Sequence, residues 1–372
     1  MVMSWLPKRE KLDPVQASAV DFVVAQEGNF YIKGEAGTGK SVVLAHVAAK
    51  FKHDNPGAKV AALTYTNAFA ACLGEGLKDS GVDVQTILRF KAKEQYDLIV
   101  VDEAQDIRLD WVNRLKKRGK KFVFAGDFTQ MIFGETVRVI TEKELISKFE
   151  ITQQPIELKR DYRLPMSQRE LLGKVYQFGH KFVSAVVNEQ HKPRITLYHA
   201  KDWTEEMKHA DEYLQGKIGK RKPAAILFNT NHKIRKFLEA VVPGLKKKFD
   251  GTGDMAFLAA VNDFLVKKES PYRYLGKGYG DLLESNERPL AYAMSWHGSK
   301  GLDFETVALP DLGRRGANVR ANTFYVAMTR SRKNLMMSYS GEAGDQTERA
   351  RTCDVVEFFS GIQGDYEQGE LL

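Results

Sequence analysis

The stretch of sequence that decides the fold is Gly34-Glu35-Ala36-Gly37-Thr38-Gly39-Lys40-Ser41, which fits the pattern G-x-x-x-x-G-K-[ST]. It follows a predicted strand, Phe30-Tyr31-Ile32, and precedes a predicted helix over Ser41–Phe51. In such a loop the glycines let backbone N–H groups turn inward around phosphates, and the N-terminus of the following helix attracts the anion. Lys40 is expected to reach the outer phosphates and Ser41 to ligate Mg²⁺. The pattern predicts a nucleotide-binding loop, and the alternative is a glycine-rich turn without a ligand.

A second, acidic motif, Val100-Val101-Asp102-Glu103-Ala104-Gln105-Asp106, directly follows another apolar run. Asp102 is expected to hold the Mg²⁺ shell, and Glu103 to polarise the attacking water. Taken alone, an acidic strand end is often only a helix cap. Combined with the phosphate loop, it predicts a chain that binds and hydrolyses a nucleoside triphosphate.

The rest of the first half alternates between helices and apolar strands. Asp13 is a plausible N-cap with Pro14 at the first helical position, and the helix runs from Val15 to about Gln26. Apolar runs without polar alternation indicate buried parallel strands; they are Val60–Leu63, Leu98–Val101 and Phe122–Ala125. This order predicts an α/β fold with a doubly wound parallel sheet and a site at the strand carboxyl ends.

The second half repeats this style. Its predicted strands are Arg194–His199, Ala224–Phe228, Leu290–Met294 and Thr306–Leu309. The segment Gly244–Gly280 gives no clear pattern, and the residues from Gly361 onward are expected to form a loose acidic tail. We predict two domains, 1–160 and 161–372.

Composition narrows the class of protein. Of the 372 residues, 43% are hydrophobic and 28% charged, which is globular and does not fit disorder, collagen or a coiled-coil rod. Two cysteines are too few for a disulfide framework or a four-cysteine zinc site. No apolar run reaches the roughly 18 residues of a membrane span, and the N-terminus lacks the apolar core of a signal peptide. We therefore expect a cytoplasmic protein without a membrane partner. The net charge of +8 favours a polyanionic partner.

Further motifs follow in order along the chain: Leu12–Gln16 (LDPVQ), Ala62–Ala68 (ALTYTNA), Ala125–Gln130 (AGDFTQ), Leu158–Arg163 (LKRDYR), Ser295–Phe304 (SWHGSKGLDF) and Tyr325–Arg330 (YVAMTR). Together with the phosphate loop and the acidic motif, they resemble superfamily 1 helicases of the UvrD/Rep/PcrA kind. The resemblance covers nearly the whole chain. It implies two RecA-like P-loop NTPase domains, each a parallel sheet flanked by helices, with the ATP site in the cleft between them.

The resemblance assigns nucleotide roles to individual residues. Gln16 would read the adenine and Tyr162 would stack on it. Gly301 and Asp303 belong to the nucleotide-binding fifth motif, where aspartate replaces the usual glutamate and so has a shorter reach toward the ribose.

The resemblance also completes the catalytic set of Lys40, Asp102 and Glu103. Gln130 would couple the γ-phosphate to DNA, and Arg163 and Arg330 would be γ-phosphate arginines supplied from the second domain. The alternative for the two arginines is that of surface salt-bridge partners. We expect Arg330 on a helix beginning near Asn322, with no local anion for its charge to meet.

The candidate DNA-binding residues also come from the resemblance; they are Thr64, Tyr65, Asn67, Phe133 and His297. Aromatic platforms suit sequence-independent binding of single strands. The alternatives are a core tyrosine at a strand end and a structural histidine. Basic clusters, among them Lys246-Lys247-Lys248 and Arg314-Arg315, could touch phosphates but are more often solvated faces.

Further departures limit the resemblance. The segment after Gln130 lacks the tryptophan-arginine pair of close relatives, although Phe133 still matches an aromatic there. The spacings between Phe90 and Asp102 and between Arg163 and Ser295 are too short for the family's large accessory domains. We therefore expect a compact motor.

The leading function is an ATP-dependent translocase or helicase acting on single-stranded DNA or a single-strand/duplex junction, with ATP and Mg²⁺ as cofactors. A second reading is a DNA-stimulated motor subunit for a protein partner, such as a nuclease or a defence or repair complex, that does not unwind alone. A third is a nucleotide-dependent binding switch. A small-molecule kinase would share the phosphate loop but would not need the second-half arginine motifs.

Overall fold

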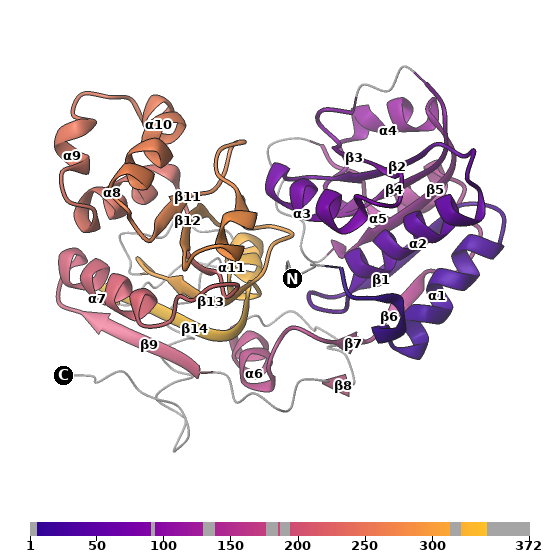
Figure 1. Cartoon of the computed structure of the whole chain (residues 1–372). Coiled ribbons are helices and arrows are strands. Elements are labelled where there is room, and N and C mark those ends of the chain that lie inside the picture. The colour runs from indigo at the N-terminus through magenta and orange to yellow at the C-terminus, as the bar shows by residue number, and fades with distance from the viewer. Residues whose placement is uncertain are drawn as a thin grey trace. The chain divides into compact units, whose positions relative to one another are not determined.

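The chain divides into two compact units in the computed structural model, which describes residues 6–90, 94–128, 138–175, 185–186, 194–312 and 321–340. Unit 1 runs to Tyr162 and includes the short strand β8 (Ala185–Val186), and unit 2 begins at Arg163 (Figure 1). The domain boundary predicted from the sequence, between residues 160 and 161, remains a prediction. In the described part of the chain, no helix combines the length and apolar character needed to cross a membrane.

Unit 1 is built on a six-stranded parallel sheet with the strand order β3-β2-β4-β5-β1-β6. Its strands are β1 (Phe30–Gly34), β2 (Val60–Thr64), β3 (Asp83–Thr86), β4 (Tyr96–Val101), β5 (Gly119–Gly126) and β6 (Ile156–Leu158). Its helices are α1 (Pro14–Ala25), α2 (Lys40–Asp54), α3 (Asn67–Leu77), α4 (Leu109–Lys116) and α5 (Glu142–Lys148), with short 3-10 turns at Arg9–Lys11 and Ala104–Asp106. The strand β7 (Arg160–Asp161) pairs with β8 outside this sheet.

The apolar strands of unit 1 form this sheet because both of its faces are covered. Side chains alternate along β4, so that Leu98 and Val100 join one core while Ile99 and Val101 join the other. Helices α1 and α2, which lie side by side, pack on the first face, and α4 and α5 contribute to the core on the second (Figure 1). Burial on both faces explains the continuous apolar runs.

Local sequence signals fix the start of α1. Asp13 caps this helix by accepting a hydrogen bond from the Gln16 N–H at 2.8 Å, and Pro14 occupies the first helical turn. The Gln16 side chain in turn accepts from the Asp13 N–H at 3.4 Å, which completes a capping box. Both the predicted cap and the predicted proline position are confirmed.

Unit 2 contains a second six-stranded parallel sheet, with the order β11-β12-β10-β13-β14-β9. Its strands are β9 (Arg194–Ala200), β10 (Ala224–Phe228), β11 (Tyr272–Tyr274), β12 (Ala291–Ser295), β13 (Phe304–Leu309) and β14 (Ser331–Ser340). Its helices are α6 (Met166–Val175), α7 (Trp203–Gln215), α8 (Asn231–Val241), α9 (Leu245–Lys248), α10 (Asp254–Lys267) and α11 (Ala321–Met328), with a 3-10 helix at Leu282–Asn286. A core of side chains from α7 to α10 covers one face of this sheet.

The two sheets confirm the predicted fold class of two RecA-like domains with parallel sheets flanked by helices. The segment Gly244–Gly280, which the sequence left without a pattern, contains α9, α10 and β11. The position expected for Arg330 is wrong, because α11 ends at Met328 and Arg330 lies in the turn before β14. The tail from Gly361 and the pair Arg314-Arg315 lie outside the described residues.

Candidate nucleotide site

The phosphate loop between β1 and α2 has a backbone that only glycine tolerates at several positions. Gly37 and Gly39 have φ angles of 86° and 82°, in the left-handed region. A Cβ at Gly34 would lie 2.5 Å from Thr38 Oγ1 and 3.0 Å from the Leu158 carbonyl oxygen. The glycine spacing read from the sequence is therefore a steric requirement of this loop.

Lys40 lies at the first position of α2, with its side chain turned back into the loop. The Lys40 Nζ donates to the Glu35 carbonyl oxygen at 2.9 Å, and Thr38 Oγ1 donates to the same oxygen at 2.9 Å. Only 9% of Lys40 is exposed. The loop thus holds a buried cation beside the helix N-terminus, which is the charge arrangement that binds phosphate.

Ser41 and Asp102 meet at the carboxyl end of β4, although 61 positions separate them in the sequence. The Ser41 Oγ donates to Asp102 Oδ2 at 2.6 Å. Burial and the neighbouring charge of Glu103 raise the pKa of Asp102 to about 6, against the opposing effects of Ser41 and Lys40. Hydroxyl and carboxylate oxygens are the ligands that Mg²⁺ prefers, and a cation would relieve the repulsion between the two carboxylates. The donor set therefore fits Mg²⁺.

Glu103 follows Asp102 in a strained conformation, with a φ angle of 55°. Its N–H donates to Asp102 Oδ1 at 2.9 Å, and its Oε2 accepts from Gln105 Nε2 at 2.6 Å. The fully buried Gln105 also accepts from the Asp127 N–H at 3.1 Å. One amide side chain therefore links the predicted catalytic carboxylate to the end of β5.

Gln105 was not among the predicted site residues, although it belongs to the quoted acidic motif. Two features of the sequence could have identified Gln105. It lies two residues after Glu103 in the acidic motif, and the neighbouring strand β5 ends in a glycine, Gly126. A Cβ at Gly126 would lie 2.7 Å from Gln105 Oε1, so the glycine makes room for the amide.

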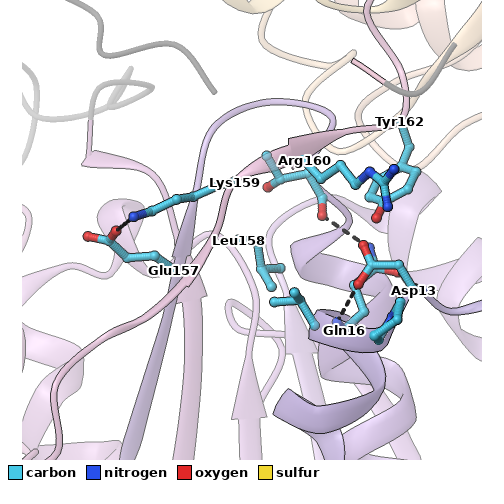
Figure 2. Close-up of a pocket in the computed structure, with 10 residues that line it drawn as sticks. Asp13, Gln16, Glu157, Leu158, Lys159, Arg160 and Tyr162 are labelled. Atoms are coloured by element: carbon cyan, nitrogen blue, oxygen red, sulfur yellow. Dashed lines mark hydrogen bonds and ion pairs between the residues drawn. The ribbon is translucent and has the colours of Figure 1, made fainter. Parts of the chain in front are cut away.

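A pocket with a volume of about 340 Å³ opens beside the loop, between the start of α1 and the end of β6 (Figure 2). Its lining residues are Asp13, Pro14, Val15, Gln16, Thr38, Glu157, Leu158, Lys159, Arg160 and Tyr162. A pocket of this size is typical of a small-molecule site. The predicted base-binding residues Gln16 and Tyr162 therefore share one pocket with the phosphate loop.

Gln16 and Tyr162 are both hydrogen-bonded to the phosphate loop. The Gln16 Nε2 donates to the Thr38 carbonyl oxygen at 3.2 Å, and the Tyr162 N–H donates to the Gly37 carbonyl oxygen at 2.9 Å. Each residue thus joins the wall of the pocket to the loop.

In unit 2, Asp303 is the centre of an arginine cluster. Its Oδ2 lies 2.6 Å from Arg332 Nε and 3.3 Å from Arg163 Nε. Burial alone would raise the pKa of Asp303, but Arg332, Arg163 and Arg330 lower it to about 2. Arg332 was not predicted from the sequence, and nothing in the motifs marks it, since it lies just after the sixth one.

Arg330 is 2% exposed, so its interpretation as a surface salt-bridge partner is wrong. Its guanidinium donates to the Val326 and Leu302 carbonyl oxygens at 2.8 and 2.9 Å, and to Thr329 Oγ1 at 3.0 Å. The expectation that its charge meets no local anion is also wrong, because the charge of Arg330 contributes to the low pKa of Asp303.

The remaining members of the fifth motif form a tight turn after β12. Gly301 has a φ angle of 82° in this turn, and the His297 carbonyl oxygen accepts from the Lys300 N–H at 3.3 Å. His297 is half-buried. Its preceding neighbour Trp296 is buried and donates through Nε1 to the Leu227 carbonyl oxygen at 2.9 Å.

The predicted DNA-binding residues of unit 1 lie at the end of β2 and the start of α3. Thr64 is buried, Tyr65 half-buried and Asn67 exposed. The Tyr65 hydroxyl donates to the Asp106 carbonyl oxygen at 2.7 Å, and its ring lies 6.2 Å from that of Trp111. Tyr65 therefore has a structural role beside the acidic motif, whatever else it contacts.

The candidates Gln130 and Phe133 lie outside the described residues. Among the described residues, no three or more His, Cys, Asp or Glu side chains gather into a metal site of their own, and the Mg²⁺ donors Ser41 and Asp102 are not such a group.

Two family models match this chain, one in each half of the sequence. Residues 11–153 match the family model of an AAA domain, and residues 290–338 match the model of a UvrD-like helicase C-terminal domain. Among solved structures, the arterivirus helicase, nonstructural protein 10, is similar with a TM-score of 0.45 and 13% identity. That match covers 86% of this chain and 61% of the viral one. No curated protein matches this chain in sequence.

Proposed function

Because this chain belongs to the superfamily 1 helicases of the UvrD type, we propose that it hydrolyses ATP to move along single-stranded DNA and to separate duplex DNA. The observation that carries this proposal is the Ser41–Asp102 hydrogen bond at the mouth of the phosphate loop. It joins the two nucleotide motifs in one site, with Glu103 as the next residue.

The chemistry of hydrolysis divides among the residues of this site. Lys40 binds the outer phosphates, and Gln16 and Tyr162 hold the base. Ser41 and Asp102 would hold Mg²⁺, which supplies charge neutralisation at the phosphates. Glu103 orients and deprotonates the attacking water, and Gln105 fixes the direction of its carboxylate through the 2.6 Å hydrogen bond.

Charge that develops on the phosphates needs further cations, and arginine is their usual source. Arg163 and Arg330 fill this role in the proposal, with Gly301 and Asp303 near the nucleotide. Support comes from unit 2, where Arg163 pairs with Asp303 and the charge of Arg330 helps to lower the pKa of the same carboxyl.

The single strand would contact Thr64, Tyr65 and Asn67 of unit 1 and His297 of unit 2, with Phe133 as a further contact. Gln130 would couple the γ-phosphate to the strand. Tyr65 supports a link between strand and nucleotide, because its hydroxyl binds the backbone of Asp106 in the acidic motif. Movement of the ring would therefore act on the segment that carries Glu103.

A second candidate function is a strand-stimulated motor that needs a protein partner for unwinding. One observation favours it: β3 ends at Thr86 and β4 begins at Tyr96, which leaves no room for an inserted accessory domain there. A nucleotide-dependent binding switch is the third candidate.

One set of measurements separates these functions. We expect ATP hydrolysis by the full chain to rise strongly with single-stranded DNA, and streptavidin to be displaced from one end of a biotinylated strand. Unwinding of a tailed duplex by the purified chain argues against the partner-dependent motor. Stimulation without streptavidin displacement supports the switch, and equal hydrolysis with and without a saturating strand contradicts the motor functions. Glu103→Gln serves as the control for contaminating ATPases.

A further inference from the structure

Two arginines in unit 2 compete for one oxygen atom. Arg332 Nε lies 2.6 Å from Asp303 Oδ2, whereas Arg163 Nε lies 3.3 Å from the same Oδ2. A charge-assisted hydrogen bond has its optimum near 2.7–2.9 Å, and it weakens at longer distances. Arg332 therefore has the stronger hold on the carboxylate, and Arg163 the weaker one.

The surroundings of the three side chains differ in a way that matters for their mobility. The side chain of Asp303 is 12% exposed and that of Arg163 21%, whereas that of Arg332 is 47% exposed. Arg163 also donates to the Thr329 carbonyl oxygen at 3.5 Å, a long contact. Its contacts with Asp303 and with Thr329 are therefore both longer than the contact between Arg332 and Asp303.

We propose that Arg332 is a positioning residue for hydrolysis: by holding Asp303 more strongly than Arg163 does, it lets Asp303 aim Arg163 while keeping that arginine transferable to the terminal phosphate. The proposal rests on the proposed function, in which Arg163 acts on the γ-phosphate. Without Arg332, Asp303 would bind Arg163 more strongly, and Arg163 would be harder to transfer to the terminal phosphate.

The substitution at Asp303 also finds a reason here. The fifth motif has aspartate where relatives of this family have glutamate. In this chain the short side chain of Asp303 pairs with Arg163 and Arg332 instead of reaching toward the ribose. We therefore expect Asp303 and Arg332 to act together. A variant of one should therefore depend on the other.

The test is a double-mutant cycle on the full chain, with strand-stimulated ATP hydrolysis as its first readout. We expect Arg332→Gln to lower kcat about tenfold, within the range of couplings in one ion-pair network. The KM for ATP should stay within about twofold, because Arg163 acts mainly in the transition state. Arg332→Lys should restore part of the rate. In an Asp303→Asn background, Arg332→Gln should have no further effect.

A second readout measures binding without hydrolysis. Fluorescent mant-ADP with beryllium fluoride imitates the γ-phosphate, whereas mant-ADP alone does not. Arg332→Gln should weaken binding of the first probe and leave binding of the second unchanged. The matched control is Arg288→Gln, another partly exposed arginine of unit 2 that pairs with Glu284, and it should change neither readout.

The outcomes separate this proposal from the proposed function. Wild-type kcat in Arg332→Gln, or the same loss of rate with and without Asp303, overturns the positioning role while leaving the motor intact. A wild-type chain that neither binds nor hydrolyses ATP overturns the proposed function, and the positioning role with it. Thermal unfolding of each variant identifies any that fails to fold, in which case Arg332→Lys carries the comparison.

Discussion

Replacing Arg330 with methionine is expected to lower the free energy of unfolding of unit 2 by about 3 kcal/mol. Methionine keeps an unbranched apolar chain of similar length but removes the guanidinium donors. In the structure these donors bind the Val326 and Leu302 carbonyl oxygens and Thr329 Oγ1. A buried hydrogen bond contributes about 1 kcal/mol on average, so three lost bonds give about 3 kcal/mol.

Calorimetry of the full chain measures this effect directly. For a domain of roughly 200 residues, 1 kcal/mol shifts Tm by about 2–4 °C, so the transition of unit 2 should fall by about 6–12 °C. Arg288→Met is the control, because its partly exposed ion pair with Glu284 should contribute less than about 1 kcal/mol.

The result also decides how a catalytic experiment on Arg330 is interpreted. A Tm within about 2 °C of the wild type would refute the reasoning, because the three bonds would then contribute nothing to the folded state. If the stability loss is found, hydrolysis must be measured well below the lowered Tm. Under that condition we expect kcat to fall by roughly 10³-fold, in the range known for catalytic arginines, with a smaller change in nucleotide affinity.

Three further predictions concern the nucleotide site and its neighbour. Lys40→Ala should weaken binding of a fluorescent ATP analogue, whereas Glu103→Gln should keep binding and stop single-turnover hydrolysis; equal losses of binding would contradict the assigned roles. Gly34→Ala should lower nucleotide affinity at least about tenfold, because the new Cβ would lie 2.5 Å from a side-chain oxygen, while Gly57→Ala, which has open space, should not. The pKa of Asp303 is lowered to about 2, so its charged form stabilises the fold above about pH 4, and this contribution is lost as the pH falls toward 2. Asp303→Asn should therefore cost about 2 kcal/mol in urea denaturation at pH 7 and clearly less at pH 3; an equal cost at both would refute the linkage.

The elements predicted correctly from the sequence are those with a strong local signal. The run Phe30-Tyr31-Ile32, the glycine loop and the helix after it appear as β1, the loop and α2, because sterics and burial act on neighbouring residues there. By contrast, β14 begins with the polar residues Ser331-Arg332-Lys333-Asn334, which hide a strand that lies between two others in the sheet. Strand β3 at the edge of the other sheet is also polar, because most of its residues are only partly buried.

Some residues of the candidate site could be predicted from sequence motifs, and others could not. Motif spacing predicted that Ser41 and Asp102 belong to one site, because parallel strands bring their carboxyl ends to one edge of the sheet. The Arg332–Asp303 pair joins positions 29 apart, and no pattern in the sequence announces it. Likewise, burial of Arg330 depends on how α11 packs, which only the tertiary structure determines.

The hydrogen bond from the Tyr162 N–H to the Gly37 carbonyl oxygen ties the point where the chain first leaves unit 1 to the phosphate loop. The next residue, Arg163, is the first of unit 2, so one peptide bond separates this anchor from the second unit. A ligand that turns the Gly37 peptide would strengthen or break this hydrogen bond and so act directly on the backbone that leads into unit 2. A change in ligand at the phosphate loop would then reach unit 2 through the main chain alone, without any contact between side chains.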